Sequence, residues 1–286
     1  MTKITSLVLS ALLICSPFWV RGDDAPSSKS IIYKKTEQGE LSLTAYFPPD
    51  WKADQKRPVI VFFFGGGWTN GKLTQFEPQS KHLAQRGMVA ICADYRVKSR
   101  HQVTPEACVE DAKSAIRWVR QNRERLGIDP NKVVGAGGSA GGHLAACTAL
   151  CDGLDSKQED LTISSKPNVL VLFNPVLNFN LPKLLERISD NSDVAEAISP
   201  TRHLAKDSPP TLLFFGTKDQ LLKQGEEFLE RSKKIGHHAE IYLAEGVGHS
   251  FFNKSPWLEK TIDRMDDFLV SQGYLKVSSA SPQTAP

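Results

Sequence analysis

The sequence predicts an α/β fold, a mostly parallel central sheet of about eight strands with helices on both faces. Short apolar runs alternate with amphipathic segments along most of the 286 residues, which is typical of strands joined by crossover helices. Residues 58–64 form a continuous apolar run, as expected of a strand buried on both faces. A Gly-x-Ser-x-Gly motif at 137–141 stands between another such run and a helical segment. Functional residues are therefore expected in the loops at the carboxyl ends of the strands, where such sheets bind ligands.

The strands are predicted from short runs of β-branched and aromatic residues that are bounded by turn residues. A turn at Gln38-Gly39 joins the first two, and the later runs are nearly uniformly apolar. In chain order the expected strands are 31–34, 41–47, 58–64, 88–94, 132–135, 168–173, 211–215 and 239–243. A chain of this length and pattern can bury a sizeable core.

Helices are predicted where apolar residues recur three and four positions apart. Thr104 and Pro105 supply a cap and a first-turn proline, and a glycine follows three of the helical segments. The expected helices are 104–126, 142–150, 228–235 and 256–272. Residues 175–208 contain several prolines and charges, so a loop with short helices is expected there, and not a large cap.

The first 22 residues have the pattern of a secretory signal peptide. Lys3 precedes the mostly apolar run 4–20, and Gly22 is the small residue after which we expect cleavage. The run is short for a membrane span and contains a proline, so no stable membrane association is expected after cleavage. A lipoprotein attached through Cys15 and a retained anchor are the less favoured alternatives. We expect export to the periplasm or outside the cell, a folded domain over 23–275, and a disordered polar tail over 276–286.

The composition excludes several classes of function. A net charge of +3 does not indicate binding to nucleic acid or to an anionic membrane. The four cysteines beyond the signal peptide have no CxxC or metal-like spacing, and neither a metal nor an organic cofactor is expected. Export permits disulfides, but buried free thiols are favoured. The sequence leaves the oligomeric state open.

The motif at 137–141 predicts a nucleophile elbow. Ser139 would lie on a sharp turn between a strand and a helix, with a strained backbone that exposes its hydroxyl. Gly137 and Gly141 flank it because side chains at these positions would collide with the neighbouring strand and helix.

A serine hydroxyl needs a base to accept its proton, and the base needs a partner that fixes its tautomer. Asp219 and His249 follow Ser139 in the order typical of this elbow, each in the loop after its own strand. We therefore predict a catalytic triad of Ser139, Asp219 and His249. His143 follows Ser139 by one helical turn and is assigned a packing or hydrogen-bonding role, and Asp94 is assigned a structural role.

An oxyanion that develops during acyl transfer needs backbone N–H donors already directed at it. Ala140, directly after the nucleophile, supplies one donor, and the glycine run 65–67 after a strand supplies the others. A plain turn and a phosphate cradle are the alternatives for this run. The run lacks the Gly-Lys-Ser/Thr and GxGxxG contexts of phosphate loops.

These residues resemble the α/β-hydrolase superfamily and, within it, the esterase/lipase group with an HGGG-type oxyanion loop. The resemblance covers about 58–268 and is closest to carbohydrate esterases that remove acetyl or feruloyl groups from xylan. The motifs that carry it are Asp94-Tyr95-Arg96, Gly138–His143, Ser199-Pro200, Gly216–Asp219 and Gly248–Phe252. The resemblance implies an α/β-hydrolase catalytic domain and identifies Gly66 and Gly67, with Ala140, as the oxyanion donors.

Two positions depart from the pattern of that group. Phe64 stands where the loop often has a histidine that braces it, so the support of the loop is in question. Gly138 stands where hormone-sensitive-lipase-like members carry aspartate.

The sequence thus predicts an exported serine carboxylesterase that acts on short, acetyl-like esters of plant-type or other polysaccharides. Trp68, beside the oxyanion loop, is a candidate for stacking on a sugar ring, and packing in the core is its alternative. The alternative functions are a serine peptidase or formamidase, and a catalytically silent binding protein with the same fold.

Overall fold

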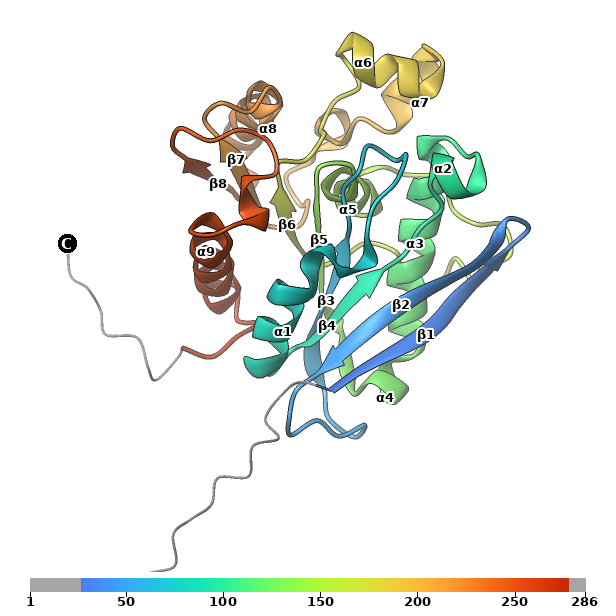
Figure 1. Ribbon diagram of the computed structural model, residues 1–286, viewed down its shortest axis with the longest axis vertical. Helices are drawn as coiled ribbons and strands as arrows, with labels where there is room; N and C mark the ends of the chain where they lie inside the picture. Colours follow the sequence, from blue (N-terminus) through green and yellow to red (C-terminus); the bar gives the residue numbers. More distant parts are fainter. Residues whose placement is uncertain (1–26, 278–286) are drawn as a thin grey trace, which may run out of the picture.

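The computed structural model describes residues 27–277 (Figure 1). The predicted signal peptide at 1–22 lies outside the described residues. Of the predicted tail at 276–286, the structure describes only the first two residues. Among the described residues, no helix has the length and apolar character needed to span a membrane.

One eight-stranded sheet forms the centre of the described part of the chain (Figure 1). Its strands are β1 (Ser27–Thr36), β2 (Gly39–Phe47), β3 (Arg57–Phe63), β4 (Val89–Ala93), β5 (Ile128–Gly138), β6 (Val169–Phe173), β7 (Thr211–Gly216) and β8 (Ala239–Ala244). They lie in the order β1-β2-β4-β3-β5-β6-β7-β8. β1 pairs antiparallel with β2, and β2 with β4, whereas all later pairs are parallel. The predicted mostly parallel sheet of about eight strands is confirmed.

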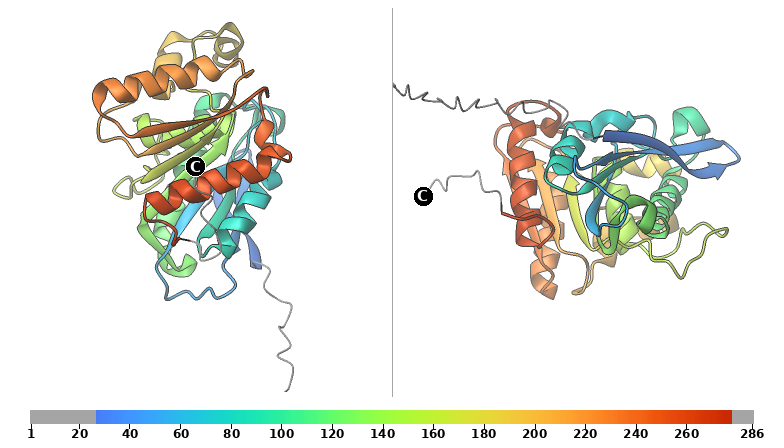
Figure 2. Two further views of the ribbon diagram at one scale, coloured as in Figure 1. Left: turned by 90° about the vertical axis from the view of Figure 1, so that its left-hand side faces the viewer. Right: turned by 90° about the horizontal axis from the view of Figure 1, so that it is seen from below.

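Helices cover both faces of this sheet and create two separate cores. On one face pack α3 (Pro105–Gln121), α5 (Ala140–Leu150) and α8 (Leu222–Ile235), and on the other α1 (Glu77–Gln85) and α9 (Trp257–Ser271). Figure 2 shows α8 and α9 on opposite sides of the strands at the β8 edge. Strands β4, β6 and β7 and the carboxyl-terminal parts of β3 and β5 are buried because helices lie on both of their faces, which explains their largely apolar sequences.

The structure departs from the expected helices in two respects. The expected helix 104–126 is divided at Asn122 into α3 and a short α4 (Arg123–Leu126). The short helix α2 (Lys98–His101) and helix α1 were not predicted. Helix α1 buries Gln79 and Ser80 along with Leu83, so its inward face lacks the apolar spacing that indicates a helix.

Residues 175–208 form the expected excursion of short helices beyond the carboxyl edge of the sheet (Figure 1). Its helices are α6 (Pro182–Leu185), the 3₁₀ turn η2 (Glu186–Ile188), α7 (Ser192–Ala197) and the 3₁₀ turn η3 (Pro200–His203). The side chain of Asn191 caps α7 by accepting hydrogen bonds from the N–H groups of Asp193 and Val194.

The cysteines in the described part of the chain are buried free thiols, as favoured above: Cys92, Cys108, Cys147 and Cys151. Asp94 is structural, since its carboxylate accepts hydrogen bonds from the guanidinium of Arg100 and from the N–H of Tyr95.

Candidate active site

Ser139 lies on a sharp turn between the end of β5 and the start of α5. Its backbone has φ 53° and ψ −117°, a conformation that is costly for a residue with a side chain. The N–H of Ser139 donates to the carbonyl of Phe173 on β6 at 2.8 Å, which ties the turn to the neighbouring strand. The strained turn presents the hydroxyl at the carboxyl edge of the sheet, as expected of a nucleophile elbow.

The glycines around Ser139 are required by close backbone contacts. A Cβ on Gly137 would lie 2.5 Å from the carbonyl of Gly141, and one on Gly141 would lie 2.1 Å from the carbonyl oxygen of Phe63. Strand β3, the turn and helix α5 therefore approach one another too closely for any side chain at these two positions.

Three side chains from three loops form one row of hydrogen bonds at this edge. Nε2 of His249 lies 2.9 Å from Oγ of Ser139, and Nδ1 of His249 lies 2.8 Å from Oδ2 of Asp219. The carboxylate of Asp219 is buried, and the imidazole is 32% exposed. Because Nδ1 faces a carboxylate, Nδ1 carries the proton, and Nε2 is left to accept from the serine hydroxyl.

The loops after β7 and β8 hold Asp219 and His249 in this row. The N–H of Asp219 donates to the carbonyl of Gly216, and the N–H of Lys218 donates to that of Val247. A Cβ on Gly216 would lie 2.2 Å from the carbonyl oxygen of Val247, so only glycine lets the two loops approach this closely.

Asn174, which the sequence reasoning missed, also contacts His249. It directly follows β6, is fully buried and has φ 37°. Its Oδ1 accepts the N–H of Ser250 at 3.0 Å, and its Nδ2 lies 3.4 Å from Nε2 of His249. Its position after a buried strand was the available signal, since every other residue of the site occupies an equivalent place.

The glycine loop after β3 leaves two backbone N–H groups free. Gly66 and Gly67 have φ 135° and 60°, and within residues 27–277 their N–H groups donate to no protein acceptor. A Cβ on Gly65 would lie 3.3 Å from Cβ of Ser139, so the loop packs directly against the elbow. Ala140 is the first residue of α5, where amides have no intrahelical acceptor.

Aromatic packing and a side-chain hydrogen bond support this loop. The ring of Phe64 stacks on Tyr95 with a centroid separation of 4.2 Å, and the Tyr95 hydroxyl donates to the Phe64 carbonyl at 2.8 Å. The N–H of Gly65 donates to Oε1 of Gln75 at 2.7 Å. The loop is therefore braced from both sides.

Trp68 packs in the core, which is the alternative stated above to stacking on a sugar ring, and it also belongs to the lining of the pocket beside Ser139. The side chain is 3% exposed and contacts the rings of His143 and Phe179. Its indole N–H donates to Nδ1 of His143 at 3.2 Å, and Nε2 of His143 lies 2.8 Å from the carbonyl of Ile198. Burial lowers the pKa of His143 to about 4, so this imidazole is neutral and has the packing role predicted for it.

A pocket of about 420 Å³ opens onto Ser139 and His249. Its lining residues are Gly67, Trp68, Ser139, Val176, Leu181, Pro182, Lys183, Leu184, Arg187, Gln220, Leu221 and His249. The excursion at 175–208 supplies part of this lining. Leu181 and Leu184 form an apolar wall, and Lys183 and Arg187 are charged residues of the same lining.

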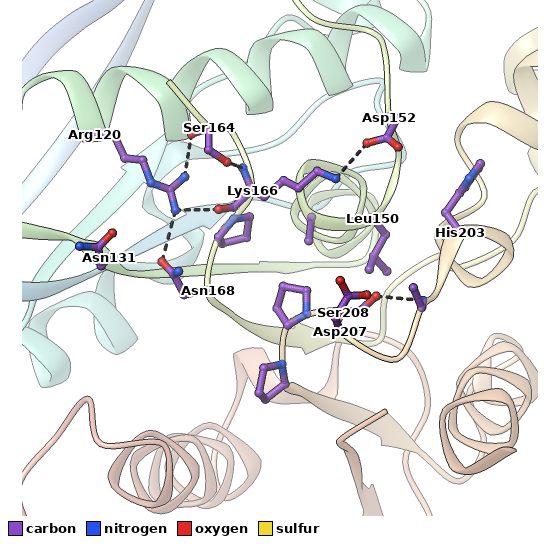
Figure 3. Close-up of a pocket in the computed structure, with 15 residues that line it drawn as sticks. Arg120, Asn131, Leu150, Asp152, Ser164, Lys166, Asn168, His203, Asp207 and Ser208 are labelled. Carbon is purple, nitrogen blue, oxygen red and sulfur yellow. Dashed lines mark hydrogen bonds and ion pairs between the residues drawn. The ribbon is translucent and has the colours of Figure 1, made fainter. Parts of the chain in front are cut away.

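A larger pocket of about 620 Å³ lies at the opposite end of the parallel strands, beside the amino ends of β6 and β7 (Figure 3). There Arg120 donates hydrogen bonds to the carbonyls of Pro130, Ser164 and Lys166, and Lys166 pairs with Asp152. The polar groups of this pocket hold its own loops together, and none of the predicted site residues lies in it. Within residues 27–277, no group of three or more His, Cys, Asp and Glu side chains has the arrangement of a metal site.

Comparisons with known proteins agree with this geometry. The sequence model of the BD-FAE family matches residues 43–231. Isoprenylcysteine alpha-carbonyl methylesterase ICME of Arabidopsis thaliana is 28% identical over 99% of this chain and 73% of its own length. Esterase LipC of Mycobacterium tuberculosis is 29% identical over 68% of this chain, which spans only 53% of the length of LipC.

Among solved structures, Thermogutta terrifontis esterase 2 phosphoramylated by tabun is 45% identical, with a TM-score of 0.84. The superposition covers 89% of this chain and 98% of that esterase. The resemblance to an α/β-hydrolase esterase is confirmed, since the family match extends over more than half of the chain. The chain belongs to the BD-FAE family, and it is a carboxylic-ester hydrolase with the α/β-hydrolase fold.

Proposed function

We propose that this enzyme hydrolyses short-chain esters through an acyl-enzyme formed on Ser139, with His249 as the base and Asp219 as its orienting acid. The observation that carries the proposal is the unbroken row of hydrogen bonds, 2.9 Å from serine to histidine and 2.8 Å from histidine to aspartate. It stands beside backbone N–H groups that have no acceptor among the described residues. These are the groups that acyl transfer to a serine needs.

In the proposed mechanism, Oγ of Ser139 attacks the ester carbonyl while Nε2 of His249 takes the hydroxyl proton. The buried carboxylate of Asp219 stabilises the imidazolium that forms. The N–H groups of Gly66, Gly67 and Ala140 stabilise the negative charge on the carbonyl oxygen. His249 then gives its proton to the departing alcohol, and a water molecule activated by His249 releases the acid from the serine.

The size of the pocket supports a short acyl group. Its volume of about 420 Å³ is shared between the acyl and alcohol halves of the ester, and Leu181 and Leu184 form one wall. Thermogutta terrifontis esterase 2 has been solved with propionate and with butyrate bound. The signal pattern at 1–22 supports export, and an exported esterase meets polymeric esters such as acetylated polysaccharides. The preference for acetyl-like groups on polysaccharides, resembling that of acetyl xylan esterases, rests on these three features.

An assay of the purified protein on 4-nitrophenyl acetate, acetylated xylan and an aminoacyl anilide tests the proposal. We expect hydrolysis of both esters and little of the anilide. An anilide hydrolysed as well as the esters would favour a peptidase or amidase, and no turnover of any substrate would favour a silent binding protein. Cell fractionation of the full-length protein tests export, which retention in the cytoplasm would contradict.

A further inference from the structure

Two cationic side chains of the active-site pocket make no ion pair within residues 27–277. Lys183 lies on α6 and Arg187 in η2, and both belong to the pocket that contains Ser139 and His249. On the same excursion, Arg202 pairs with Glu196. Neither positive charge beside the site is thus within ion-pair distance of a described carboxylate, whereas a more distant arginine is paired.

The guanidinium of Arg187 is anchored against the oxyanion loop. Its Nη1 donates to Oγ1 of Thr69 at 2.8 Å, and its Nη2 lies 3.9 Å from the position that a Cβ on Gly67 would occupy. Arginine has five N–H donors, and this contact uses one of them. The side chain is therefore held in place with donors left for a ligand that binds next to Gly67.

No free carboxylate is found among the described residues that line the pocket. Its other lining residues are apolar or neutral, apart from His249. The carboxylate of Asp219, behind the imidazole, is buried and is engaged by His249 and by the N–H of Leu221. An anion entering the pocket would therefore meet two positive charges and an apolar wall, with no like charge among the lining residues.

We propose that Arg187 and Lys183 form an anion subsite, and that the preferred ester carries a carboxylate a few bonds from its scissile carbonyl. The inference deepens the ester hydrolysis proposed above and rests on it. Guanidinium groups bind carboxylates with paired N–H donors, and the lysine adds a second, mobile charge. The carboxylate belongs either to the acyl half, as in the half-ester of a dicarboxylic acid, or to the alcohol half, as in an acetylated hexuronate.

Matched pairs of esters separate these two sources. The acyl pair is 4-nitrophenyl hydrogen glutarate against 4-nitrophenyl valerate, and the alcohol pair is acetylated methyl glucuronide against acetylated methyl glucoside. We expect kcat/KM for the anionic member of one pair to exceed that of its neutral partner about tenfold, since each exposed charge contact contributes a few-fold. The preference should weaken as salt is raised, because exposed charges are screened.

Variants then assign the preference to the two side chains. Arg187→Gln and Lys183→Gln should each lower the anionic-to-neutral ratio of kcat/KM several-fold, and Arg187→Lys should retain part of it. Lys206→Gln removes an equal charge from the excursion, away from the pocket lining, and should leave the ratio unchanged.

Hydrolysis of the neutral esters with no preference in either pair would overturn the subsite but leave the proposed esterase intact. The subsite would also be overturned if Arg187→Gln lowered kcat/KM by the same factor for both members of a pair. The side chain would then act only by supporting Thr69. No hydrolysis of any ester would overturn both proposals.

Discussion

Nδ2 of Asn174 lies 3.4 Å from Nε2 of His249, the same ring nitrogen that faces the hydroxyl of Ser139. The orientation of the amide is fixed because its Oδ1 accepts the N–H of Ser250 at 3.0 Å. Asn174 therefore directs N–H groups, and not an acceptor, at Nε2.

We predict that Asn174→Asp moves the acid limb of the kcat/KM profile to higher pH by about one unit. The new carboxylate still accepts from Ser250, but it also stabilises the imidazolium, as a nearby opposite charge does. The measurement is the pH profile of kcat/KM on a neutral short-chain ester. The ester is neutral so that its binding does not depend on Lys183, Arg187 and Asp219, which are the other charged groups around the ring. Asn131→Asp at the opposite edge of the sheet is the charge-matched control. An unshifted limb in Asn174→Asp would show that the amide does not act on His249.

Ser139→Ala should abolish ester hydrolysis while leaving the fold intact. Loss of a triad member typically costs on the order of 10⁴ to 10⁶ in rate. Steady-state kinetics measure the loss, and circular dichroism checks the fold. Ser271→Ala on α9 is the control and should retain full activity. More than about a tenth of wild-type activity in Ser139→Ala would assign the nucleophile elsewhere.

Gly138→Asp should destabilise the protein, because a side chain at this position collides with two aromatic rings. A Cβ at Gly138 would lie 2.6 Å from Cζ of Phe252 and 3.2 Å from Cζ of Phe76. Overpacking of this kind typically costs about 1–3 kcal/mol. Denaturant unfolding measures the loss, and the double variant with Phe252→Leu should recover part of it. Equal losses in the single and double variants would show that the ring of Phe252 is not the cause.

The sequence was sufficient for the features that depend on local pattern. The buried parts of strands β3 to β7 are largely apolar, and Ser139, Asp219 and His249 each follow a strand. Helix α1 escaped prediction because the polar residues Gln79 and Ser80 lie on its buried face. The burial of Trp68 depends on His143 and Phe179, which are distant in sequence, and the contact of Asn174 with His249 depends on how β6 and β8 are arranged. The place of Asn174 after a strand indicates the end of the sheet at which it lies, but local sequence does not reveal which distant residues such side chains contact.

Protein stability should fall as the pH is lowered from about 6.5 towards 4, in part because of His143. Burial holds its folded-state pKa at about 4, whereas an unfolded histidine titrates near about 6.5. Between these values the unfolded state binds one more proton than the folded state, so the free energy of unfolding decreases with falling pH. The full contribution is about 3 kcal/mol, at 1.36 kcal/mol per pH unit.

Denaturant unfolding at pH 7 and pH 4.5 measures this effect. His143→Gln should reduce the loss between the two conditions, whereas His203→Gln, at a partly exposed position, should not. His101 and His237, whose pKa values are also lowered by burial, act in the same direction, so part of the pH dependence should remain in His143→Gln. An identical pH dependence in His143→Gln and the wild type would contradict the assignment.

The last prediction concerns the length of the acyl chain. A pocket of about 420 Å³ with Leu181 and Leu184 as an apolar wall offers contact to a short chain, and each buried methylene contributes about 0.8 kcal/mol. Beyond the wall, further methylenes gain no burial and must displace the excursion or extend into water. We therefore expect kcat/KM to be highest from acetyl to butyryl esters and to drop steeply beyond about eight acyl carbons. Leu184→Ala should shift the optimum to longer chains, because it removes part of the wall, while Leu161→Ala, at an exposed position outside the pocket lining, should not. Efficient hydrolysis of long-chain triglycerides, or activation at a lipid interface, would instead require the excursion to open as a lid and would identify a true lipase.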